Sequence, residues 1–274
     1  KPYLNLATEV ALDQVTMAFK LMFDPLKVNL GRLLITLPEG EIAVDGAATA
    51  EPDGWRWALN LTSGSATPEH ILRYWPSDLK SKLRRWIAAN ILDGALSDIN
   101  LYLRSAPNQN LRTHLGFLFR DARVKFLKTL PPLQDAVGYV TLTDARLVAG
   151  IEAGWVKAAQ GGMIDTAGTT FVIPDTRIKP APAEVGLIAN SSLTAALSIL
   201  DEPPFRFVSK SKLRTQTMQG QAAVSAKFNF VLKKKLPPKQ VRFEATGKIT
   251  DFSSTAIIRD HRLSAEKISL FLDP

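Results

Sequence analysis

Strict alternation of apolar and polar residues over most of the chain is the feature that most limits its fold. In residues 15–23 every odd position is apolar, and Thr16, Ala18 and Lys20 lie between them. Because successive side chains of a β-strand point to opposite faces, such a run predicts a strand with one apolar and one polar face. The same alternation recurs in residues 55–61, 99–103, 115–119, 224–232, 241–245 and 268–272. We therefore expect an antiparallel sheet with one dry face.

Two stretches have a helical period instead. Residues 77–94 place Leu79, Leu83 and Trp86 on one side, and we expect Ser77 to be the N-cap and Gly94 to end the helix. Residues 190–204 contain a second apolar stripe, begin with one of two adjacent serines as the cap, and stop at two consecutive prolines. The sequence thus predicts two short amphipathic helices.

The first of these helices is strongly basic, with Lys80, Lys82, Arg84 and Arg85 close to its apolar residues. One interpretation is that the apolar stripe packs on the sheet while the charges are solvated, which we favour because surface helices usually behave in this way. The other is that the helix lies on an anionic membrane surface.

A short motif, Lys-x-Leu-Pro-Pro, occurs at residues 128–132 and again at 234–238. Two adjacent prolines cannot donate to a strand ladder, so each copy predicts the end of a strand. The Pro-Pro pairs, the Ile-Leu-Asp ends of the two predicted helices and the glycines that follow are each separated by 106 to 109 residues. This common spacing indicates an internal repeat within one module spanning residues 1–274, with units 1–77, 78–189 and 190–274.

The charge balance is basic: 34 Lys and Arg against 26 Asp and Glu give a net charge of +8. A basic surface suits an anionic partner, but it also keeps exposed strand edges from aggregating, and we favour the second explanation. There is no cysteine, which excludes disulfides, thiol catalysis and cysteine-bound zinc. We expect the same chain to continue at both ends, because it starts abruptly at Lys1 and ends abruptly at Pro274.

Signals for catalysis, metals and nucleotides are weak. His70, His114 and His261 are far apart and none lies in a zinc-binding pattern, so we expect structural or solvent-exposed roles for them. No nucleophile elbow or phosphate-binding glycine loop is found, and Lys233, Lys234 and Lys235 lack the aromatic residues of an RNA-binding surface. We expect a protein that is not an enzyme, has no cofactor or metal and binds no nucleic acid.

The order of three segments resembles the AsmA-like superfamily. They are YWPSDLKSKLRRWIAANILDG at 74–94, PPLQDAVGYVTLTDARL at 131–147 and SSLTAALSILDEPPFRF at 191–207. More narrowly, they resemble the periplasmic domain of unknown function in YhdP-type proteins, which are relatives of TamB, and the similarity covers most of residues 70–274. The resemblance implies a periplasmic protein, anchored to the inner membrane by a segment outside these residues, that carries phospholipid toward the outer membrane.

Together, pattern and resemblance predict a mostly-β fold: an elongated, curved antiparallel sheet that forms a hydrophobic groove, with the two helices against or across it. Two short helices give little cover to about a dozen strands, so the dry face needs another partner. We expect that partner to be phospholipid acyl chains. The side chains predicted to line the groove are Phe19, Leu21, Phe23, Trp57, Leu59, Leu101, Leu103, Phe117, Phe119, Phe228, Phe230 and Leu270.

A second function from another class stays open at this point. A TamB-like module could serve as an assembly scaffold whose sheet edges pair with strands of outer-membrane proteins by β-augmentation. The two functions differ in which part of the sheet they use, because acyl chains need its dry face and strand addition needs its edge.

Overall fold

The computed structural model describes residues 12–203, 205–211, 218–234, 236–258 and 261–273. Lys1, Pro204, Lys235 and Pro274, which were singled out in the sequence, lie outside these ranges. By its internal contacts the chain divides into two compact units. Unit 1 comprises residues 1–120 and 139–147, and unit 2 comprises residues 121–138 and 148–274.

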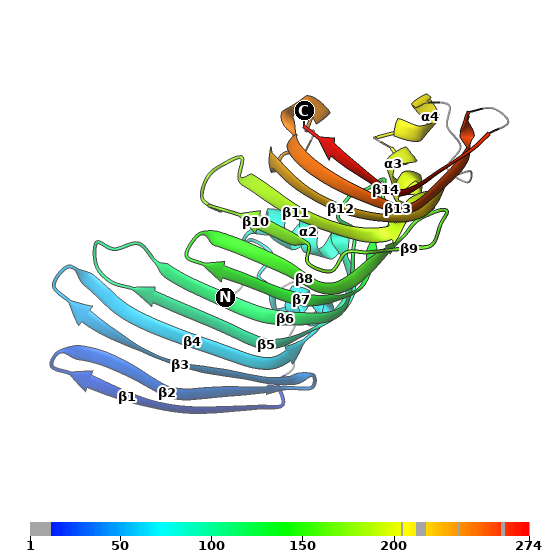
Figure 1. Cartoon of the computed structure of the whole chain (residues 1–274). Coiled ribbons are helices and arrows are strands. Elements are labelled where there is room, and N and C mark those ends of the chain that lie inside the picture. The colour runs from blue at the N-terminus through cyan, green and yellow to red at the C-terminus, as the bar shows by residue number, and fades with distance from the viewer. Residues whose placement is uncertain (1–11, 204, 212–217, 235, 259–260, 274) are drawn as a thin grey trace. The chain divides into compact units, whose positions relative to one another are not determined.

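The fold is mostly β, as predicted, and its strands form a 14-stranded antiparallel sheet (Figure 1). The strand order follows the sequence from β1 to β14, except that β9 lies off this path and pairs with β8 and β11. The strands are β1 (Gln14–Phe23), β2 (Leu26–Leu37), β3 (Gly40–Glu51), β4 (Gly54–Ala66), β5 (Ile91–Ser105), β6 (Arg112–Val124), β7 (Leu133–Thr143), β8 (Arg146–Lys157), β9 (Met163–Asp165), β10 (Thr170–Ile173), β11 (Pro182–Ser192), β12 (Met218–Val231), β13 (Arg242–Ile258) and β14 (His261–Leu272).

Four short α-helices occur in the described part of the chain, two more than the sequence predicted. They are α1 (Pro68–Tyr74), α2 (Ser81–Asn90), α3 (Leu193–Asp201) and α4 (Phe207–Ser211), and a 3-10 turn covers Pro238–Gln240. The first pair of helices connects β4 to β5, and the second pair lies between β11 and β12. Helices α1 and α4 are only 7 and 5 residues long, too short to produce a recognisable helical period.

The predicted ends of the first helix are wrong. A turn closed by the Leu79 N–H donating to the Pro76 carbonyl at 3.1 Å comes first, and Lys80 then adopts a left-handed conformation. Helix α2 therefore begins at Ser81, without a side-chain cap, rather than at Ser77. At its other end Gly94 lies inside β5, because the Ile-Leu-Asp segment continues directly into the sheet. For α3 the prediction is confirmed: Ser192 is the N-cap and accepts a hydrogen bond from the Ala195 N–H.

Both Pro-Pro pairs lie between strands, in the connections from β6 to β7 and from β12 to β13, but β6 already ends at Val124 and β12 at Val231. The elements between each helix and its Pro-Pro pair are nevertheless different. Strands β5 and β6 occupy the first interval, whereas α4 and β12 are the described elements of the second. The similar spacing thus does not reflect the same succession of elements, and the three-unit division stays a prediction.

β-Bulges interrupt several ladders. Between β12 and β13 the register shifts at Gly220, which has a φ of 137°. A Cβ at this glycine would lie 2.7 Å from the Thr250 carbonyl oxygen, so only glycine fits there. The adjacent Asp251 also has a positive φ, 53°. Because bulges bend a strand and increase its twist, they account for the bent strands seen in Figure 1.

The buried interior is sparse for a chain of this length. Most of the buried hydrophobic residues that the structure describes are alanines. The larger ones are Leu37, Val156, Ile164, Leu193, Val208 and Met218. Few large apolar side chains are therefore fully removed from water, although the strands are rich in Phe, Leu and Trp.

Candidate functional site

Unit 1 has a continuous apolar sheet face. The cross-strand register aligns Met17, Leu33, Val44, Leu61 and Leu101 in one row across β1 to β5. Directly opposed residues on neighbouring strands share a face of the sheet, so the row is a band of apolar contact. Parallel rows add the predicted residues Phe19, Leu59 and Leu103, and then Leu21 and Trp57.

An aromatic contact assigns the corresponding face of β6. The Tyr102 ring of β5 stacks on the His114 ring of β6, with ring centroids 5.8 Å apart. These two residues therefore share one face, and the odd-numbered residues of both strands share the other. Phe117 and Phe119 consequently lie on the same face as Leu101 and Leu103.

Unit 2 has an apolar face of the same kind. Phe171, Val185, Phe228 and Phe243 are aligned across β10 to β13, and the Phe228 and Phe243 rings stack with centroids 6.1 Å apart. A neighbouring row places Leu270 of β14 beside Gly247. In each unit, "apolar face" denotes the sheet side that carries these residues, and "polar face" denotes the opposite side.

None of the twelve side chains predicted to line a groove is buried. Phe19, Leu21, Phe23 and Leu270 are exposed, and Phe23 is the most open at 79%. The other eight are half-buried by their neighbours on the same face. The four exposed residues belong to β1 and β14, the first and last strands of the sheet order. The apolar faces are thus not closed into a solid core at these positions.

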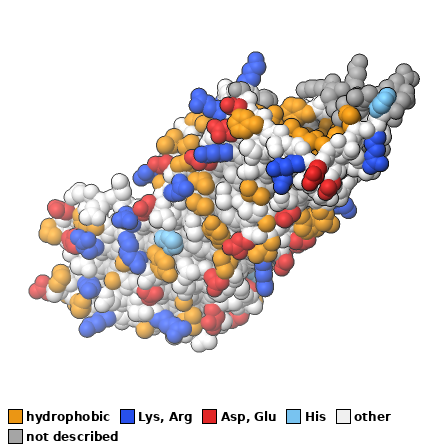
Figure 2. Space-filling view, viewed as in Figure 1, with side chains coloured by type: hydrophobic (Ala, Val, Ile, Leu, Met, Phe, Trp, Pro, Cys, Tyr) orange, Lys and Arg blue, Asp and Glu red, His pale blue; other side chains and the backbone are white. Residues whose placement is uncertain are grey.

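Side chains on the polar face of unit 1 form hydrogen bonds to one another across the strands. Asn60 donates through Nδ2 to Asp45 Oδ2 at 2.6 Å, and Arg104 donates through Nη2 to Asn60 Oδ1 at 2.5 Å. This short ladder crosses β3, β4 and β5. Charged side chains of both signs spread over the surface turned to the viewer in Figure 2. The charged and hydrogen-bonded side chains of the polar face are suited to water rather than to hydrocarbon.

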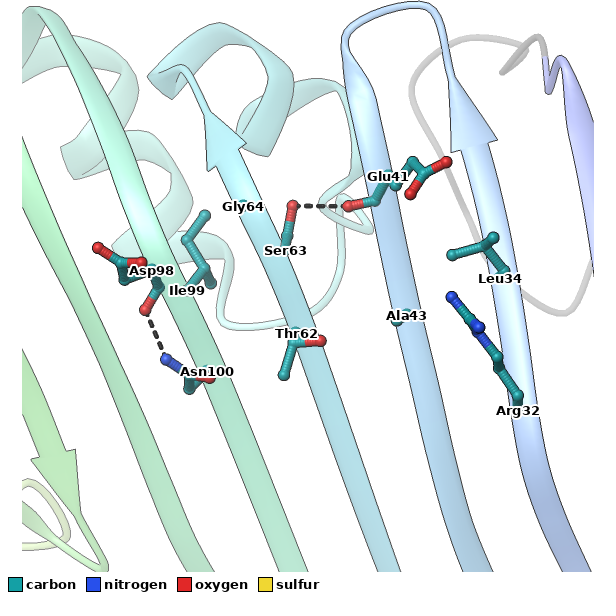
Figure 3. Close-up of a pocket in the computed structure, with 10 residues that line it drawn as sticks. All are labelled: Arg32, Leu34, Glu41, Ala43, Thr62, Ser63, Gly64, Asp98, Ile99 and Asn100. Carbon is teal, nitrogen blue, oxygen red and sulfur yellow. Dashed lines mark hydrogen bonds between the residues drawn. The ribbon is translucent and has the colours of Figure 1, made fainter.

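Two shallow hollows also lie mainly on the polar faces. The hollow in unit 1, about 360 Å³, is lined by residues that include Arg32, Thr62 and Asn100 (Figure 3). The hollow in unit 2, about 350 Å³, includes Lys227 and Glu244. Neither contains any of the twelve predicted residues. The hollows and the predicted lipid-contacting residues are therefore separate surfaces.

Helix α3 covers one end of the apolar face in unit 2. Leu193 forms a buried cluster with Met218 and Ala222, and Ile249 and Phe252 pack against it. Ala222 and Ile249 belong to the apolar face, since they oppose each other between β12 and β13. Helix α3 therefore supplies the cover that the sequence led us to expect of both helices.

Part of the apolar face in unit 1 was missed by the sequence reasoning. Strand β2 contributes Val28 and Leu30 and then, after a register shift, Leu33 and Ile35. The shift moves the apolar positions from even to odd numbers, so a search for strict alternation fails there. The detectable signal is a change of phase at the Gly31-Arg32 pair, where the apolar positions pass from Val28 and Leu30 to Leu33 and Ile35.

A polar cluster joins α1 to the turn between β2 and β3. Glu39 Oε1 accepts hydrogen bonds from the Tyr74 hydroxyl and from Arg73 Nη1, both at 2.8 Å, and His70 Nε2 lies 3.8 Å away. The hydrogen bond from Tyr74 is the main reason that the pKa of Glu39 lies below its ordinary value. His70 thus has a structural neighbour, in keeping with the role expected for it.

The described residues contain no cluster of three or more metal-ligating side chains placed to hold an ion. Within the same residues, no helix is both long and apolar enough to cross a membrane. Comparisons with protein-family models, with curated proteins and with solved structures each find no match.

Proposed function

We propose that the apolar faces bind the acyl chains of phospholipids. On this proposal the chain is a hydrophobic segment of a periplasmic lipid-transfer protein that moves phospholipid between the inner and outer membranes. The observation that carries it is the exposure of the aligned apolar side chains. The twelve residues predicted to line a groove lie on the apolar faces, and those in β1 and β14 lie on the outermost strands. None of the twelve is buried.

The energetics favour an apolar ligand over water on these faces. Burying one methylene group contributes about 0.8 kcal/mol, so a 16-carbon chain leaving a bilayer would lose roughly 13 kcal/mol if it entered water. A face of mixed Phe, Trp and Leu side chains offsets much of this cost. This face also carries few polar groups that could bind a specific headgroup. Weak specificity is suited to a surface along which lipids move.

Native mass spectrometry of the purified chain tests the proposal. We expect co-purified phospholipid on the unaltered protein and its loss in Phe228→Asp, because a carboxylate on the apolar face would have to be desolvated beside hydrocarbon. Ser225→Asp is the matched control, since Ser225 is exposed on the polar face of the same strand. Equal lipid content in the two variants would count against the proposal.

The assembly-scaffold function makes a different prediction about β14. Among the described strands, β14 pairs with β13 alone. Ser269→Lys adds an edge charge that disfavours strand addition, so it should weaken capture of an outer-membrane protein strand while leaving lipid content unchanged. Loss of strand capture with normal lipid content would favour the scaffold function.

A further inference from the structure

Helix α2 presents Leu83 and Trp86 outward, contrary to the packing that we favoured from its sequence, and only Ile87 of its large apolar residues is half-buried. None of its residues is buried. Leu83 and Trp86 are 48% and 49% exposed, and Leu79 in the preceding turn is 55% exposed. Three large apolar side chains that lie within eight residues of each other are therefore left open to solvent.

Arg84 explains this orientation because it takes the inward position. Its Nη2 donates to the Leu72 carbonyl at 2.9 Å, and its Nε donates to the Trp75 carbonyl at 3.3 Å. The Trp75 indole in turn donates to the Leu79 carbonyl at 2.6 Å. These bonds satisfy carbonyls at the end of α1 and fix α2 with the side opposite Arg84 facing outward. That side carries Leu83 and Trp86, since they are separated by three residues.

The outward side is also cationic. Lys80, Lys82 and Arg85 are exposed, and no carboxylate of the described residues forms an ion pair with any of them. Asp78 is the only acidic residue between positions 70 and 92. Cations next to an exposed Trp and two Leu residues match the two layers of a bilayer surface, anionic headgroups above an apolar interior.

We propose that the outward side of α2 docks on the surface of an anionic phospholipid bilayer. "Docking side" here means Leu79, Lys80, Lys82, Leu83, Arg85 and Trp86. The helix is about 15 Å long, so it would lie in the plane of the interface rather than cross it. This contact is separate from acyl-chain binding on the sheet, and it would bring the protein to the membrane from which a lipid is taken or to which it is delivered.

Vesicle flotation of the full chain tests the docking side. The probes are vesicles of phosphatidylcholine alone and vesicles of phosphatidylcholine mixed with phosphatidylglycerol. We expect binding to the mixed vesicles, weakened about fivefold for each cation lost, so Lys82→Glu with Arg85→Glu should reduce it by at least about 25-fold. Leu79→Ser with Leu83→Ser keeps Trp86 as the reporter and should abolish insertion, seen as loss of the membrane-dependent change in Trp fluorescence.

The control is the pair Lys227→Glu and Lys248→Glu, which removes two exposed cations from the polar face of unit 2. Circular dichroism and melting curves establish that each variant is folded. Two results would overturn the proposal: equal loss of binding in the control, and equal binding to vesicles of phosphatidylcholine alone. Absence of binding to the mixed vesicles would also overturn it, and this result is expected if the docking side binds an acidic protein instead. Retained co-purified lipid in Lys82→Glu with Arg85→Glu would separate this outcome from failure of the acyl-chain proposal.

Discussion

The helical connections of the two units occupy equivalent places, between strands of the sheet. They differ in whether their large apolar side chains are buried or exposed. Leu193 of α3 is 5% exposed and packs on Met218 and Ala222. Helix α2 has no buried residue, and Leu83 and Trp86 face outward. The comparison shows that an amphipathic helix beside an open sheet need not cover it.

Sequence composition explains the difference. Helix α3 reads LTAALSILD and has no basic residue, so its apolar side can approach the sheet without burying charge. Helix α2 reads SKLRRWIAAN, and Arg84 in its first turn points toward the Leu72 carbonyl of α1. A guanidinium that satisfies those carbonyls competes with Leu83 and Trp86 for the inward position.

The largest expected effect that separates the two helices is in the free energy of unfolding. Leu193→Ala should lower it by about 2–5 kcal/mol, because it removes buried methyl groups and leaves a cavity against Met218. Leu83→Ala should change it by less than about 0.5 kcal/mol, since that side chain is half exposed. Urea denaturation followed by circular dichroism measures both. Equal losses would mean that α2 is buried as α3 is.

A smaller difference is expected at the helix caps. The Ser192 hydroxyl donates to the Gly161 carbonyl at 2.7 Å and accepts from the Ala195 N–H at 3.1 Å. Thr67 caps α1 with a single, longer contact from the His70 N–H at 3.3 Å. We expect Ser192→Ala to cost about 1–2 kcal/mol and Thr67→Ala about 0.5–1 kcal/mol, read from denaturation midpoints. A larger loss of stability in Thr67→Ala than in Ser192→Ala would show that the cap of α1 contributes more than the cap of α3.

The smallest expected effects depend on pH. Asp201 accepts hydrogen bonds from the Ser209 hydroxyl and N–H, both at 2.7 Å, and these bonds lower its pKa. The pKa of Glu39 is lowered too, chiefly by the Tyr74 hydroxyl. A carboxyl with a lowered pKa stabilises the fold above its unfolded pKa, and this contribution is lost as the pH falls through the lower folded value.

The contributions of Asp201 and Glu39 to stability should therefore be complete at pH 7. They should be lost below about pH 4, where unfolded Asp and Glu titrate. Amide hydrogen exchange measured across this range tests the effect. Helix α1 should lose protection as Glu39 is protonated, and α4 should lose protection as Asp201 is protonated. Asp201→Asn should remove the acid-dependent step at α4 and leave the step at α1 intact. Protection at α4 that is equally acid-sensitive in this variant would rule out Asp201 as its origin.

Half of the strands were predictable because their signal is local. Alternation identified β1, β4, β5, β6 and β12 to β14, and two serines before an apolar stripe located the start of α3. Strand β2 was not found, since a bulge between Leu30 and Leu33 reverses its phase. Strand β3 was missed because its apolar positions are largely alanine, which has low contrast with its neighbours.

What could not be predicted depends on contacts between elements. The orientation of α2 is set by Arg84 reaching two carbonyls of the preceding helical segment, and no spacing within α2 reveals it. The exposure of the predicted groove residues likewise depends on what covers the sheet, which alternation alone does not determine. The assignment of Phe117 and Phe119 to a shared face with Leu101 needed the contact between Tyr102 and His114.

Site-specific photo-crosslinking in cells tests the lipid-binding account most directly. A photoreactive amino acid is placed at Phe117 on the apolar face or, as the matched position, at the adjacent Leu118, an exposed apolar side chain on the opposite face of β6. We predict a phospholipid adduct at Phe117 and none at Leu118. Adducts of equal yield at both positions, or none at Phe117, would contradict the claim that acyl chains bind the apolar face.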